Sequence, residues 1–319
     1  MILWLVIFVV ALFVLIRSAD YFIDASETIS IQFNIPSFIV GATLVSIGTS
    51  LPELVASSFA VLEGAPEIVV GNVVGSNISN ILLIFGVALP VMKRININFS
   101  DLKVDYMFLF GTSVVLVIFL WDYKISTIEV VFLLAGMISY VFYLVKHHKI
   151  ANEDIEKYDG EKVGWKVYTQ FVLSAVAIFI SAKYTVEAII ELARIFEIGA
   201  EIIALTVVSL GTSIPELAVS ISAARKGLTD IVIGNILGSN IFNTLAVMSI
   251  PAFFGKLVIP VDINYYSLPI MVLATVLFVI IAIRKTGGTT SGIILLGLYV
   301  LFIVGIFEKW NLKDLIDKI

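Results

Sequence analysis

Ten apolar segments, each long enough to cross a lipid bilayer as a helix, constrain the fold of this 319-residue chain more than any other feature. Hydrophobic residues make up 60% of the sequence and charged residues 14%, against about 45–50% and about 25% in soluble domains. So few polar side chains cannot cover a water-facing surface, which excludes a soluble enzyme. The sequence predicts an all-α membrane protein with spans at 2–30, 37–62, 67–91, 104–121, 126–146, 167–194, 200–224, 230–254, 265–284 and 289–307.

Composition also narrows the chemistry. Cysteine is absent, so disulfides, thiolate catalysis and Cys-ligated metal centres are excluded. No cluster of Lys and Arg with interleaved aromatic residues is present, and we expect no nucleic-acid partner. No catalytic triad, phosphate loop or dinucleotide fingerprint is found, so we expect no prosthetic group and no enzymatic activity. The first apolar segment lacks a basic start and a small-residue cleavage site, and it is interpreted as a span and not as a removable signal.

The two halves of the chain repeat each other. IGTSLPEL at 47–54 recurs as LGTSIPEL at 210–217, and GNVVGSNISN at 71–80 recurs as GNILGSNIFN at 234–243. Glu53 and Glu216 lie 163 residues apart, as do Asn80 and Asn243, so one gap-free register covers both motifs. Each copy holds five spans, an odd number, so the second copy must enter the membrane from the opposite side. Such inverted repeats are common in secondary transporters, which bind their substrate near the midplane on interrupted helices.

A charged linker divides the copies. We expect a first repeat at 1–146, a cytoplasmic linker at 147–166 and a second repeat at 167–319. With the linker inside, most Lys and Arg residues fall on the cytoplasmic side, which agrees with the positive-inside rule. The sequence thus predicts a multi-pass protein of the cell membrane with both termini outside. We expect the chain to be embedded in the lipid bilayer and to function as a monomer.

The first motif of each copy combines a proline with hydroxyls and an acid. Pro52 and Pro215 donate no backbone hydrogen bond and crowd the carbonyl four residues earlier. We therefore expect the helix to break, which frees carbonyls near 46–49 and 209–212. Irregular backbone at membrane depth is tolerated only where it is buried or lines a cavity. Freed carbonyls beside hydroxyls and a carboxylate would form the oxygen cage that hard cations prefer.

An ionised acid inside a span is costly and marks a functional site by default. Glu53 and Glu216 both meet this description, which favours a role as cation ligands. The alternative is structural, because Ser50-x-x-Glu53 also matches a helix capping box. Capping does not explain why both copies pair the acid with a Thr-Ser run and no nearby basic residue.

The second motif places polar residues on one helix face. Asn72, Ser76 and Asn80 are four residues apart, as are their equivalents Asn235, Ser239 and Asn243. Residues with this spacing line up along a helix, and we expect the two stripes to take part in ion coordination. The G-x-x-x-G pairs in the same segments, at 71 and 75 and at 234 and 238, are expected to serve close helix packing.

Together these motifs resemble the α-repeats of the Ca²⁺/cation antiporter superfamily, in its Na⁺/Ca²⁺ exchanger branch. The resemblance implies exchange of Na⁺ for Ca²⁺, both carried as substrates, with three Na⁺ for one Ca²⁺ and net charge movement. Asn243 stands where potassium-dependent relatives carry Asp, which argues against K⁺ co-transport. The short linker cannot hold the Ca²⁺-sensing domain of eukaryotic exchangers, so the chain resembles an unregulated prokaryotic member.

The same resemblance assigns roles to individual residues. It implies that the two acids are the central ligands and that carbonyls around two threonines complete the Ca²⁺ site. Serine hydroxyls would line the Na⁺ sites, with Asn side chains meeting water or ion at the centre. The residues concerned are Glu53, Glu216, Thr49, Thr212, Ser46, Ser209, Ser50, Ser213, Ser76, Ser239, Asn80 and Asn243.

Three other functions fit the residues less well. Ionisable acids also permit Ca²⁺/H⁺ exchange on the same fold, and intramembrane oxygens also suit a passive cation channel. An inverted repeat with a closed cage suits alternating access better than a channel. An intramembrane metal hydrolase would be expected to carry His ligands in its spans, and both His residues lie at the linker.

Overall fold

The computed structural model describes residues 1–33, 35–92, 99–150, 164–195, 211–260, 263–284 and 288–308. All regular elements within these ranges are helical. In chain order they are α1 (Ile2–Gln32), α2 (Ser37–Val40), η1 (Gly41–Val45), α3 (Ser46–Leu62), α4 (Glu67–Ile78), η2 (Ser79–Phe85), α5 (Gly86–Met92), α6 (Phe99–Leu120), α7 (Thr127–Ile150), α8 (Trp165–Ile195), α11 (Ile214–Arg225), α12 (Thr229–Phe242), η5 (Asn243–Val247), η6 (Pro251–Phe253), η7 (Ile263–Ser267), α13 (Leu268–Arg284) and α14 (Thr289–Phe307).

Nine stretches among the described residues are long and apolar enough to cross a membrane, and each coincides with an expected span. The seventh expected span is described only in part, by α11, because residues 200–210 lie outside the described ranges. The match holds because helix length here follows the length of the apolar run. The fold is thus the expected one, an all-α membrane protein of two inverted five-helix repeats.

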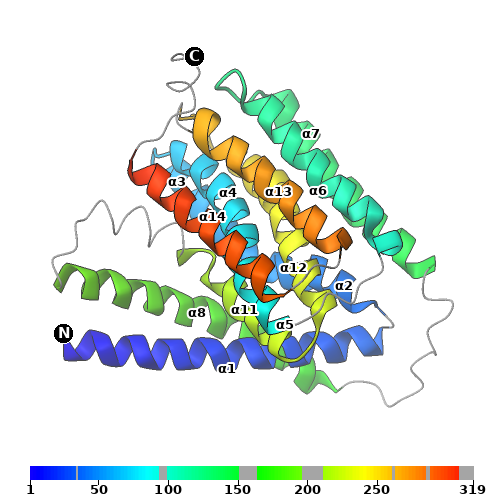
Figure 1. Cartoon of the computed structure of the whole chain (residues 1–319), viewed down its shortest axis with the longest axis vertical. Helices are drawn as coiled ribbons and strands as arrows, with labels where there is room; N and C mark the ends of the chain where they lie inside the picture. The colour runs from blue at the N-terminus through cyan, green and yellow to red at the C-terminus, as the bar shows by residue number, and fades with distance from the viewer. Residues whose placement is uncertain are drawn as a thin grey trace.

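The helices form a bundle flanked by one long pair. α1 and α8 pack against each other and run along one edge of the molecule, across the direction of α13 and α14 (Figure 1). α12 lies at the centre, where it packs against α2, η1 and α3 of the other copy. Every residue of α12 except Asp230 is buried. Helices of the two copies therefore interlock at the core, where the motif residues lie.

Glycines let this central packing become close. A Cβ atom at Gly234 would lie 2.4 Å from the carbonyl oxygen of Phe38, and one at Gly238 would lie 2.5 Å from that of Ala42. The G-x-x-x-G pair of the second copy thus serves helix packing, as expected. Among the described residues, Gly71 and Gly75 have no such close neighbour.

The expected helix break at Pro52 is wrong. α3 continues from Ser46 to Leu62 with Pro52 inside it. Pro52 still supplies no donor to the carbonyl of Gly48, but the rest of the helix holds the regular path. The departure from α geometry lies earlier, in the π-helical η1. In the second copy the chain does leave the helix, since α11 begins at Ile214 with Pro215 in its first turn.

Further π-helical segments occur at matching places in the two copies. η2 begins at Ser79 and η5 at Asn243, so both contain an Asn of the second motif. Wide turns of this kind are rare and are frequent at functional sites, because they interrupt the regular hydrogen-bond ladder. These changes of helix type in the third and eighth spans were not expected, since the expected breaks lay at Pro52 and Pro215.

Candidate ion-binding site

Two buried acids form the centre of the candidate site. Glu53 lies in the middle of α3 and Glu216 in the first turn of α11, and their residues are 1% and 2% exposed. The two carboxyl groups are close enough to repel each other when both are ionised. No Lys or Arg pairs with either of them among the described residues. A cation between them would remove this repulsion.

Hydroxyl groups link each acid to the other copy. Ser50 donates to Oε1 of Glu216 over 3.0 Å. The Thr49 hydroxyl also faces the Glu216 carboxyl, and the Thr212 hydroxyl faces that of Glu53. Each carboxylate is therefore contacted by the opposite repeat, Glu216 by Thr49 and Ser50 and Glu53 by Thr212.

The helix-capping interpretation of these acids does not hold. Glu53 is seven residues inside α3, so Ser50 is not at a helix start. α11 does begin close to Glu216, with Ser213 at its N-cap, but the Ser213 side chain makes no capping hydrogen bond. A capping box needs that bond from the serine.

Asn72 joins the two copies through a dense set of hydrogen bonds. Its amide nitrogen donates to Ser57 Oγ over 2.9 Å and to the carbonyl oxygen of Glu53 over 3.3 Å. Its amide oxygen accepts from Ser76 and Thr212, each over 3.4 Å. Since both ends of the amide are engaged, Asn72 holds other site residues in place, which differs from the ligand role expected for the whole stripe.

Asn235 repeats this arrangement in the second copy. Its amide nitrogen donates to Ser220 Oγ over 3.0 Å, and its amide oxygen accepts from Thr49 over 3.4 Å. The two sets of hydrogen-bonded residues are therefore equivalent under the 163-residue offset. They are Ser57–Asn72–Thr212 and Ser220–Asn235–Thr49. Sequence reasoning missed Ser57 and Ser220. Their signal was present, because each lies four residues after a motif Glu and matches the other in the repeat register.

Several buried polar atoms at the centre have no hydrogen-bond partner among the described residues. The Oδ1 atoms of Asn77 and Asn240 in the second motif are among them, and eight other atoms belong to expected site residues. These eight are Oε2 of Glu53 and of Glu216, Oγ of Ser213 and of Ser239, and both amide atoms of Asn80 and of Asn243. Buried polar groups are normally satisfied, so this group of atoms calls for a bound ion or water.

The remaining expected ligands differ in their surroundings. Ser46 is completely buried and donates to the carbonyl of Thr43, and Ser76 is buried and bonds Asn72. Ser209 lies outside the described residues. Within the described ranges, no group of three or more His, Cys, Asp or Glu side chains that could hold a metal ion is found. The candidate site is therefore two acids within a shell of neutral oxygens.

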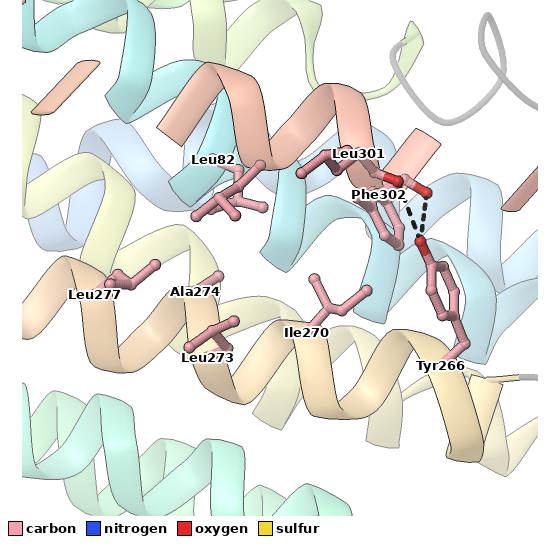
Figure 2. Close-up of a pocket in the computed structure, with 9 residues that line it drawn as sticks. Leu82, Tyr266, Ile270, Leu273, Ala274, Leu277, Leu301 and Phe302 are labelled. Atoms are coloured by element: carbon pink, nitrogen blue, oxygen red, sulfur yellow. Dashed lines mark hydrogen bonds between the residues drawn. The ribbon is translucent and has the colours of Figure 1, made fainter. Parts of the chain in front are cut away.

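Other hollows do not resemble an ion site. One of about 150 Å³ lies between α13, α14 and η2, and its labelled side chains are apolar except for the Tyr266 hydroxyl (Figure 2). That hydroxyl donates to the carbonyls of Leu301 and Phe302 (Figure 2). The Tyr266 hydroxyl thus already has hydrogen-bond partners, and among the described residues no carboxylate that could bind a cation lines the crevice.

Comparison with known proteins points to one family. The family model described as sodium/calcium exchanger protein matches residues 3–146 and 166–307, one segment in each half. The solved sodium-calcium exchanger NCX_Mj, soaked without Na⁺ and Ca²⁺, superposes with a TM-score of 0.84 at 29% identity. That match covers 96% of this chain and 99% of NCX_Mj.

Two of the relatives match this chain over nearly their whole length. The sodium/calcium exchanger MaX1 of Methanosarcina acetivorans is 31% identical over 94% of this chain and 97% of its own length. The inner membrane protein YrbG of Escherichia coli is also 31% identical, over 94% of this chain and 95% of its own length. The human sodium/potassium/calcium exchanger 4 is 32% identical over only 40% of this chain and 20% of its own length.

Proposed function

Because the chain belongs to the sodium/calcium exchanger family, we propose that it is a secondary antiporter that uses inward Na⁺ flow to expel Ca²⁺. The observation that carries the proposal is the group of buried oxygens, centred on Glu53 and Glu216, that have no hydrogen-bond partner among the described residues. Oxygen ligands suit both Na⁺ and Ca²⁺. An empty site with two facing carboxylates is costly in a medium of low dielectric constant, so the site crosses the membrane only when loaded.

In this proposal Ca²⁺ binds between the two acids. Two bidentate carboxylates and the carbonyls of Thr49 and Thr212 would supply about six oxygens, the lower end of the range for Ca²⁺. Na⁺ ions would bind among the serine hydroxyls and the carbonyls beside them. We assign these roles to Ser46, Ser209, Ser50, Ser213, Ser76 and Ser239. Asn80 and Asn243 complete the centre with neutral amides.

The resemblance to the exchanger family supplies a ratio of three Na⁺ to one Ca²⁺, and the charge of the site then decides whether exchange is electrogenic. The two acids contribute a charge of −2, which one Ca²⁺ or two Na⁺ neutralise. A third Na⁺ would leave excess positive charge, because Asn80 and Asn243 are neutral. Exchange of three Na⁺ for one Ca²⁺ therefore moves net charge across the membrane. Exchange is independent of K⁺, since Asn243 offers no additional negative charge to a further cation.

The proposed topology places the linker in the cytoplasm and both termini outside, in agreement with the distribution of Lys and Arg. The site between the repeats at 1–146 and 167–319 opens alternately to the two sides of the membrane. One chain contains both halves of the site, so a monomer suffices for transport. The chain makes and breaks no covalent bond.

Flux in proteoliposomes tests the proposal against its alternatives. Purified protein is reconstituted with ⁴⁵Ca²⁺ inside, and efflux is measured under an imposed Na⁺ gradient, an imposed pH gradient, or neither, with and without K⁺. We expect efflux only with external Na⁺ and no effect of K⁺. Efflux driven by the pH gradient without Na⁺ would establish the Ca²⁺/H⁺ exchanger instead. Efflux that needs no counter-ion would establish a channel.

A further inference from the structure

α1 is tied to α11 by a set of polar contacts away from the ion site. Asp20 accepts a hydrogen bond from Ser222 Oγ over 2.6 Å. Lys226 donates to the carbonyl oxygen of Asp20 over 2.8 Å and forms an ion pair with Asp24. We call these four residues the α1–α11 latch. It joins the long helix pair to the core at one end.

The repeat register defines an equivalent set in the other half. An offset of 163 residues relates Asp20 to Lys183, Asp24 to Glu187 and Lys226 to Glu63, while Ser222 corresponds to Phe59, which has no hydroxyl. Lys183 lies on α8, the counterpart of α1, and Glu63 follows α3, the counterpart of α11. The charges of one pair are reversed, because Asp20 and Lys226 become Lys183 and Glu63. The ion pair itself is not reversed, since Asp24 and Lys226 become two acids, Glu187 and Glu63.

This second set is not joined in the structure. Lys183 and Glu63 are exposed, and no hydrogen bond or ion pair connects them among the described residues. The Lys183 ammonium instead lies 6.0 Å from the ring centroid of its neighbour Tyr184. α1 packs much more extensively on α11 than α8 packs on α3. The long pair therefore leans toward one half of the core.

Two crevices beside the long pair show the same asymmetry. One of about 330 Å³ lies between α1, α8 and α11, and one of about 530 Å³ lies between α1, α8 and α3. Several of their lining residues are repeat equivalents, such as Ile214 with Leu51 and Ala218 with Val55. The smaller crevice is bounded by latch residues Asp20 and Ser222. The same interface is thus tighter where the latch is made.

We propose that Lys183 and Glu63 form an alternative latch, closed when the long helix pair leans toward the other half of the core. The inference depends on the proposed transport function, because inverted repeats exchange their conformations when access alternates. In that exchange the neighbours Asp20 and Lys226 are replaced by Lys183 and Glu63, which attract each other. Lys183 also offsets the repulsion between Glu187 and Glu63. Each latch holds one of the two states.

Cysteine cross-linking tests this directly, since the chain contains no native cysteine. The double variant Lys183→Cys/Glu63→Cys is reconstituted and treated with a short bifunctional thiol reagent that dithiothreitol can cleave. We expect a cross-link that stops Ca²⁺ exchange, and recovery of exchange after cleavage. Asp24→Cys/Lys226→Cys should behave in the same way in the state seen here. Glu63→Cys/Lys226→Cys is the matched control, because inverted topology places these two positions at opposite ends of the spans.

Charge exchange provides a second measurement that needs no cross-link. Lys183→Glu should shift the ratio of the two states by up to about fivefold, the size of an exposed ion pair, and so slow exchange. Lys183→Glu/Glu63→Lys should restore the rate. If the cysteine variant exchanges Na⁺ for Ca²⁺ but cross-links no better than the control, the latch is wrong while the transport function stands. Absence of exchange in the unmodified chain would refute the function itself.

Discussion

Glu53 and Glu216 are the residues whose charge the site needs most. Each has one carboxylate oxygen without a partner among the described residues, in a buried setting. Glu53→Gln keeps the shape of the side chain and removes one negative charge. We expect Ca²⁺ exchange to fall at least about tenfold, equal to about 1.4 kcal/mol, because Ca²⁺ would then face a single carboxylate. Glu67→Gln, an exposed position on α4, should exchange Ca²⁺ at the original rate in the same assay. Substantial transport by Glu53→Gln would contradict the central assignment.

Ser57 is expected to affect the ion site indirectly, through its hydrogen bond with Asn72. Its hydroxyl accepts from Asn72, which in turn holds Thr212 and the carbonyl of Glu53. Ser57→Ala removes one buried hydrogen bond, worth about 1 kcal/mol. We expect the concentration of Ca²⁺ for half-maximal exchange to rise about two- to fivefold, and Ser220→Ala to have the same effect. Ser58→Ala is the control, since the Ser58 hydroxyl only bonds the carbonyl of Leu54 in its own helix. Equal effects of the Ser57 and Ser58 variants would exclude a positioning role.

At the scale of helices, hydropathy and repeat spacing were sufficient to predict the spans and their pairing. Each described span begins and ends within a few residues of its apolar run, because membrane thickness sets that length. The wide turns η1, η2 and η5 could not be predicted, since they depend on which carbonyls the neighbouring helices satisfy. The helix at Pro52 could not be predicted for the same reason. A local rule predicted a break, but packing on both sides keeps α3 continuous.

Close packing of α12 on η1 gives a prediction at this scale. Gly238→Ala would place a Cβ atom 2.5 Å from the carbonyl oxygen of Ala42 and 2.6 Å from Ser46 Oγ. Backbone cannot yield as a flexible side chain can, so we expect a loss of about 1–3 kcal/mol in stability. Gly297→Ala is the control, because no described atom lies within 4 Å of its added Cβ. Thermal melting in detergent measures both variants. If the Gly238→Ala protein has the same melting temperature as the control, α12 and η1 can move apart at little cost in stability.

At the scale of the whole molecule, the sequence predicted that motif residues of both halves meet at one site, but not which side chains pair there. Glu216 meets Ser50, and Asn235 meets Thr49, although each pair is far apart in the chain. The inverted repeat explains this, because equivalent helices are brought to opposite sides of one centre. The lean of α1 and α8 toward one half could not be predicted. Both halves carry the same pattern, and the energy difference between two leaning states depends on a few contacts such as Asp24–Lys226.

A membrane potential should therefore act on the complete transport cycle. If three Na⁺ move against one Ca²⁺, one net charge crosses per cycle, worth about 2.3 kcal/mol per 100 mV. At equal Na⁺ on both sides, a potential of 100 mV should then hold roughly a fiftyfold Ca²⁺ gradient, since about 1.4 kcal/mol corresponds to a factor of ten. A thiocyanate gradient can impose the potential without K⁺, and a Ca²⁺-sensitive dye inside the vesicles reports the gradient. Vesicles containing the Glu53→Gln variant control for leakage. A Ca²⁺ distribution that ignores the potential would mean that charge is balanced within the cycle, as two Na⁺ on the two acids would do.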